Sequence, residues 1–115
     1  MLYTEFTLYT YTVDLVPLSC LYNLERLNYR VAYIGDITGF VHCHLGTVHP
    51  DNKITHITFR QEDDLGHRVG DIDDMLTSKR FPFLETVQVE NKGHIDLFPK
   101  LVAQGVEINS VFSYK

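Results

Sequence analysis

Apolar residues in the second half of the chain recur at the spacing of short strands. Two sets of three share this spacing: Ile54, Ile57 and Phe59, then Leu84, Val87 and Val89. Runs of helix type begin at Asp71 and Asp96, where an acid precedes an apolar stripe. From Ile54 to Phe112 the chain is therefore predicted to run strand, helix, strand, helix, strand.

Each of these units offers an apolar corner, a short strand and a returning helix, and Ile108 and Val111 repeat half of the pattern. In this respect the second half of the chain resembles the leucine-rich repeat proteins. The resemblance implies β-α units stacked side by side, with a sheet that displays a binding face. Parallel strands joined by right-handed crossover helices account for the same residues without a repeat family.

The first half predicts a different arrangement. Polar and apolar residues alternate from Leu2 to Val13, which indicates a long strand. Asp14 then opens a predicted helix, and a strand is expected from Arg30 to Ile34. The apolar stripe assigned to this helix is Leu18, Leu21, Leu24 and Leu27.

The segments Gly39 to His49 and Lys53 to Arg60 are interpreted as a hairpin, because proline, aspartate and asparagine between them favour a turn. The predicted fold is a single α/β domain over residues 1–115. Its mixed sheet has an antiparallel N-terminal part and a parallel, leucine-rich-repeat-like C-terminal half.

Composition excludes several classes of protein. The 115 residues are 44% hydrophobic and 22% charged, as in ordinary globular domains, and the net charge is −5. Without a clustered basic face, direct binding to nucleic acid is not expected. No segment resembles a secretory signal or a membrane span, and Cys20 and Cys43 form no disulfide framework. We therefore expect a protein of the cytoplasm.

His42 and His44 are the candidate metal ligands. On a strand they would project from one face, as two ligands of a zinc or iron ion must, while His49 and His56 would share the other face. The alternative is that these histidines lie on a solvated or partner-facing strand. No catalytic residue is predicted, because the chain has no phosphate loop, dinucleotide fingerprint or serine elbow.

Acids gather between residues 62 and 74. Solvation and the start of a helix account for them, and a basic partner is the functional alternative. The tyrosines of the first strand either cover the core or meet a partner. The candidate partner-binding residues are Tyr9, Tyr11, Glu62, Asp63, Asp64 and Arg68.

Small size, negative charge and the missing catalytic motifs favour a non-catalytic interaction protein. Such a protein would be an inhibitor, an immunity-type protein or an assembly subunit, encoded by a virus or phage or by a cell, that binds another protein through its sheet surface and acidic loop. The alternative is a small metal-dependent enzyme or metal sensor that uses His42 and His44. Self-association through the strand Leu2 to Val13 is compatible with either hypothesis.

Overall fold

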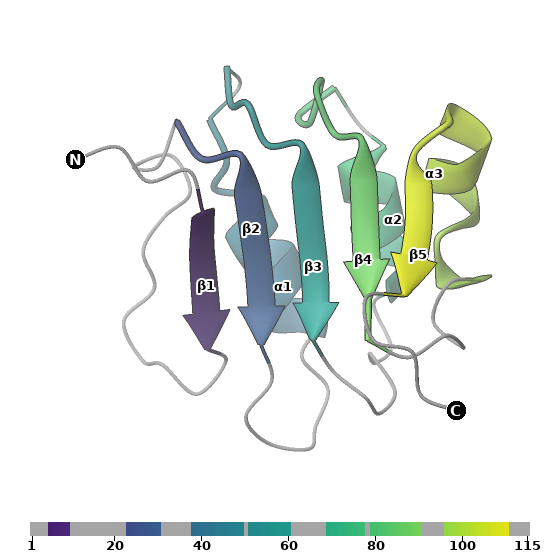
Figure 1. Ribbon diagram of the computed structural model, residues 1–115, viewed down its shortest axis with the longest axis horizontal. Coiled ribbons are helices and arrows are strands. Elements are labelled where there is room, and N and C mark those ends of the chain that lie inside the picture. Colours follow the sequence, from purple (N-terminus) through teal and green to yellow (C-terminus); the bar gives the residue numbers. More distant parts are fainter. Residues whose placement is uncertain are drawn as a thin grey trace.

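A computed structural model describes residues 5–9, 23–30, 38–49, 51–60, 69–77, 79–90 and 96–110. Strands and helices alternate along most of the chain (Figure 1). The strands are β1 (Glu5–Tyr9), β2 (Arg26–Arg30), β3 (His56–Arg60), β4 (Thr86–Val89) and β5 (Glu107–Ser110). The helices are α1 (Thr38–Leu45), α2 (Val69–Leu76) and α3 (Pro99–Gln104).

The sheet has five strands, all parallel, and they lie side by side in chain order. The predicted α/β class and parallel second half are thus confirmed. The prediction of an antiparallel N-terminal part is wrong, because β1 and β2 pair in parallel. The predicted hairpin of residues 39–60 does not form either, because β3 pairs in parallel with β2 and β4. A parallel neighbour is reached only by a connection that returns across the sheet, so residues 38–45 belong to a connection.

The register shows a repeat of constant length in the middle of the sheet. Arg26 pairs with His56 and His56 with Thr86, so both of these units span 30 residues. A third apolar set therefore lies in phase with the two sets seen in the sequence. It consists of Leu24, Leu27 and Tyr29, all fully buried.

This third set corrects the sequence-based assignment around β2. Leu24 and Leu27 belong to the approach to β2 and to the strand itself, not to a helical stripe. The strand occupies residues 26–30, ahead of the predicted span of residues 30–34. Leucine at both positions suits a helix and a strand alike, so spacing within one unit did not decide between them. Residues 14–22 lie outside the described ranges.

The three helices cover one face of the sheet (Figure 1). In α1, Val41, His44 and Leu45 are buried and Cys43 is exposed, which is the burial period of a helix lying against the sheet. The core between the layers is continuous and includes side chains from β2, β3, β4 and the three described helices. At its centre the rings of Tyr29, Phe59 and Phe98 stack in series, with centroids 5.7 and 5.8 Å apart.

Two buried polar side chains connect successive units. The amide nitrogen of Asn52 donates to the carbonyl oxygens of His49 (2.8 Å) and Arg80 (2.5 Å), and its oxygen accepts from the Ile54 N–H. Asn52 thereby ties the turn before β3 to the turn before β4. Since its side chain is 2% exposed, these bonds replace the water that burial removes.

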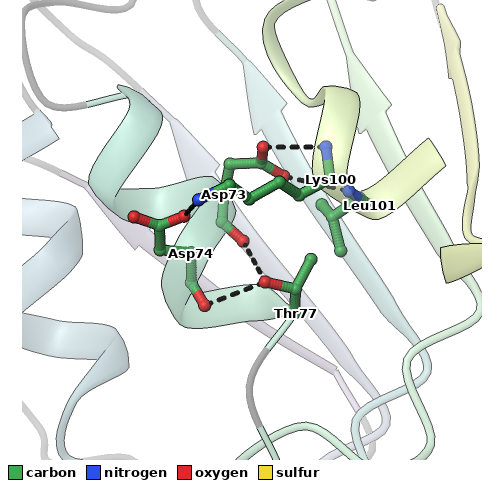
Figure 2. A network of polar contacts seen from close by, with 5 residues as sticks. All are labelled: Asp73, Asp74, Thr77, Lys100 and Leu101. Atoms are coloured by element: carbon green, nitrogen blue, oxygen red, sulfur yellow. Dashed lines mark hydrogen bonds and ion pairs between the residues drawn. The ribbon is translucent and has the colours of Figure 1, made fainter. Parts of the chain in front are cut away.

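Asp73 makes the corresponding connection between α2 and α3 (Figure 2). Its carboxylate is buried and accepts from the backbone N–H groups of Lys100 (3.0 Å) and Leu101 (3.1 Å). Phe98, at the N-cap of α3, supplies no side-chain cap, and Pro99 has no N–H to satisfy. A neighbouring helix therefore caps α3 in place of a residue on its own chain segment.

The start of α2 differs from the sequence-based prediction, whereas the end of α3 agrees with it. Asp71 lies in the first turn of α2 and is exposed, but it does not cap the helix, which begins at Val69. Gly105 ends α3 in the left-handed conformation, with φ of 97°, as a glycine at this position predicts. Lys100 donates to Asp74, and this bond raises the pKa of the Lys100 ammonium.

Replacing Asp73 by alanine is expected to lower the free energy of unfolding by about 2 kcal/mol, because two buried N–H groups lose their acceptor. Urea denaturation at neutral pH measures this change, and faster amide exchange at Lys100 and Leu101 localises it to α3. Asp74→Ala is the matched control, since it removes the same charge from an exposed neighbour. Equal losses in the two variants would contradict the capping role of Asp73.

Candidate functional site: the open face of the sheet

The face of the sheet opposite the helices carries polar side chains in rows. We call this surface the open face and define it by the residues that alternate with the core positions of β2 to β5. They are Arg26, Asn28, His56, Thr58, Thr86, Gln88, Glu107 and Asn109. Because each row follows the strand register, side chains of adjacent strands lie about 4.8 Å apart.

The central row of the open face is uncharged. It joins Asn28, Thr58, Gln88 and Asn109 as successive register partners. The Thr58 hydroxyl donates to Oε1 of Gln88 at 3.1 Å, which fixes two members of the row. Thr58 itself is buried at 8% exposure, so the adaptable hydrogen bonds that this row offers to a bound surface come from the half-buried amide groups, which both donate and accept.

The row nearest the start of the strands is charged at its two ends. It runs from Arg26 through His56 and Thr86 to Glu107. The two ends are separated by three strand spacings, about 14 Å, which exceeds the screening length at physiological salt. The cation and the anion therefore do not neutralise each other. The register continues the row to β1, where Glu5 is the partner of Arg26, so Arg26 at β2 stands between an acidic position at β1 and the acid of β5.

Most of the predicted partner-binding residues are not among those that the structure describes. Tyr11, Glu62, Asp63, Asp64 and Arg68 lie outside the described residues. Tyr9 is the last residue of β1, where its Cα is the register partner of Arg30. Glu62 follows β3 by two residues along the chain.

His42 and His44 lie on helix α1, so the prediction that they share one face of a strand is wrong. Residues two positions apart in a helix are separated by about 200° around its axis, so His42 and His44 do not share one face of α1. His44 is buried at 1% exposure, and its Nδ1 lies 2.8 Å from the Tyr29 hydroxyl. The two rings meet edge to face, with centroids 5.6 Å apart. His44 thus helps to attach α1 to β2.

The other histidines also lie apart from this pair. Nδ1 of His49 accepts from the Asp51 N–H at 3.0 Å, in the turn before β3. His56 is on the open face, where its Nδ1 is 2.8 Å from the Thr55 hydroxyl. Within the described ranges, no three or more histidine, cysteine, aspartate or glutamate side chains are grouped so as to hold a metal ion.

Sequence reasoning did not identify the open face residue by residue. Its members are common polar types, and nothing in their order distinguishes them from solvated surface. The signal that would have located them is the apolar set in each unit, because the residues between its members must project to the other side of a strand. Applying that rule at Leu24 as well as Ile54 and Leu84 predicts the central row.

No protein-family model matches the chain, and comparisons with curated proteins and with solved structures also give no match. In the described part of the chain no helix is long and apolar enough to cross a membrane.

The buried contact between Tyr29 and His44 predicts a dependence of stability on alkaline pH. Burial raises the pKa of the Tyr29 hydroxyl well above its ordinary value of 10.0. The folded state therefore keeps this proton longer than the unfolded chain, and stability is lost as pH rises above about 10. Tyr29→Phe removes this contribution together with a hydrogen bond worth about 1 kcal/mol.

Urea denaturation between pH 8 and pH 11 tests this expectation. Wild type should be more stable than Tyr29→Phe at pH 8, and the difference should narrow above about pH 10. Tyr29→Phe also controls for the titration of the other tyrosines, because it retains all of them. A difference that stays constant across this range would show that the Tyr29 pKa is not raised in the folded state.

Proposed function

We propose that this chain is a small, non-catalytic interaction protein that binds another protein through the open face of its sheet. The observation that carries the proposal is the division of the sheet into a helix-covered apolar face and a polar face on which no described helix lies. Polar groups arranged in register on a rigid sheet are preorganised, so ordering them costs little on binding.

The order of the strands supports a repeat-type architecture. Five parallel strands in chain order, with the described helices on one side of the sheet, are the arrangement expected of a short solenoid of the leucine-rich repeat kind. The apolar sets at β2, β3 and β4 have the spacing of the consensus of that repeat. The last unit, from Thr86 to Glu107, is 21 residues long, within the range of that family, whereas the two 30-residue units are slightly longer than it. Solenoids of this type use the exposed sheet as a binding face.

The charge pattern specifies the partner more closely. A basic group on the partner would face Glu107 at β5. The acidic segment Glu62 to Asp64, with Arg68 behind it in the chain, would add contacts to a basic patch beyond the end of β3. Tyr9 and Tyr11 would extend the same surface past β1. The partner we propose is a folded protein, and an inhibitor, immunity-type or assembly role would use this surface.

Self-association remains a proposal for the opposite end of the sheet. Among the described strands β1 has only β2 as a neighbour, so its other side is an edge. Edge strands present N–H and C=O groups to another chain. Pairing of β1 between two copies would leave the open face available to a second protein.

The open face is tested with a pair of glutamine variants. Gln88→Arg places a bulky cation in the middle of the open face, whereas Gln104→Arg places the same group on exposed α3. Affinity capture from a native lysate, quantified by mass spectrometry, should recover a stoichiometric protein with wild type and with Gln104→Arg. Recovery with Gln88→Arg should fall at least tenfold. A bulky cation in the centre of the interface should weaken the binding free energy by more than about 1.4 kcal/mol.

Equal recovery by both variants would place the partner elsewhere on the molecule. Recovery of no macromolecule by wild type would contradict the interaction function itself. Circular dichroism and urea denaturation of both variants establish that each is folded before capture is compared.

A further inference from the structure

A second binding surface lies at the C-terminal edge of the sheet, away from the open face. A groove of about 510 Å³ runs between α3 and β5, and we call it the edge groove. Its lining residues are Asp96, Pro99, Val102, Val106 and Ile108. Four of the five are apolar, and Val102 is 55% exposed. The volume is in the range of sites that hold several side chains of a ligand.

The strand beside the groove is an edge strand among the described strands. Within the described sheet β5 pairs only with β4. The Glu107 N–H donates to the Glu85 carbonyl, toward β4. In a parallel strand successive residues direct their backbone groups to opposite sides, so the N–H and C=O of Ile108 face away from β4. An extended chain placed there continues the ladder.

The two faces of such an added strand would meet different surroundings. Ile108 is the register partner of the buried Val87, so it lies on the helix-covered face, as does the groove. Glu107 and Asn109 lie on the open face. Every second side chain of an added strand would therefore enter the edge groove, and the alternate ones would lie beside Glu107 and Asn109.

Charge distinguishes between a second copy of this chain and a different partner. Residues 96–110 contain three charged side chains, Asp96, Lys100 and Glu107. Lys100 is already bonded to Asp74. Pairing two copies through β5 would bring their acids together without a free cation from this segment. A chain that carries lysine or arginine complements the edge instead.

We propose that the edge groove binds an extended segment of another protein, which adds to β5 as a sixth strand and alternates apolar residues with lysine or arginine. The apolar side chains fill the space beside Val102 and Ile108, and the basic ones pair with Glu107 on the other face of the strand. This is strand addition, a mode of recognition in which backbone hydrogen bonds give affinity and alternate side chains give selectivity. It uses a different set of apolar residues from the open face but shares Glu107 with it.

Fluorescence anisotropy with labelled synthetic peptides tests the proposal on the full chain. The probe is a seven-residue peptide in which lysine alternates with valine. The control has the same composition with all lysines first, so its net charge is identical. We expect the alternating peptide to bind at least tenfold more tightly than the control. Equal affinities would reduce the interaction to nonspecific attraction and overturn the proposal.

Two further comparisons locate the site. Val102→Asp should weaken binding of the alternating peptide at least tenfold, whereas Phe83→Asp, at the other large exposed apolar residue of the described chain, should leave it unchanged. N-methylation of alternate peptide nitrogens should abolish binding in one phase and spare it in the other, because only one set donates to β5. Insensitivity to Val102→Asp or to the phase of methylation would overturn strand addition.

Sedimentation of the protein without peptide tests whether a second copy of this chain occupies the edge groove. Wild type and Val102→Asp are expected to have the same oligomeric state. A wild-type dimer that Val102→Asp dissociates would assign the edge groove to a second copy of this chain and overturn the proposal. Urea denaturation of each variant shows that altered binding does not arise from unfolding.

Discussion

All five strands run in one direction, and a parallel neighbour is reached only by a segment that crosses back over the sheet. The described helices of these connections lie on the same face, and that face also receives the apolar residues of β2 to β5. The other face is left with the residues between them, which are polar. The division between core and candidate binding surface follows from this single constraint, and so does the edge at β5.

Neighbouring units are held together by a few contacts that pass from one to the next. Asn52 connects the turns before β3 and β4, Asp73 on α2 caps α3, and His44 on α1 contacts Tyr29 of β2. In an architecture of stacked units, stability resides in such nearest-neighbour contacts as much as within each unit. The stack of Tyr29, Phe59 and Phe98 adds an apolar connection through the same core.

The sequence predicted most where a local signal was unambiguous. The apolar sets at Ile54 and Leu84 located β3 and β4, and Gly105 located the end of α3. It misled at α1, where Val41, Cys43 and Leu45 alternate like a strand although Val41, His44 and Leu45 are the buried group. The metal hypothesis for His42 and His44 depended on that alternation. Eight residues are too few for periodicity alone to separate the two structures.

The sequence by itself determined the α/β class, the parallel second half, and the positions where the chain must turn, because these depend on residues within a few positions of one another. Only the tertiary structure decided that the first strands are also parallel, that Asp73 caps a different helix, and that the polar residues of β2 to β5 align in rows. These features join residues about 20 to 30 positions apart in the chain. Their geometry is fixed by strand register and by packing between units, which no local pattern encodes.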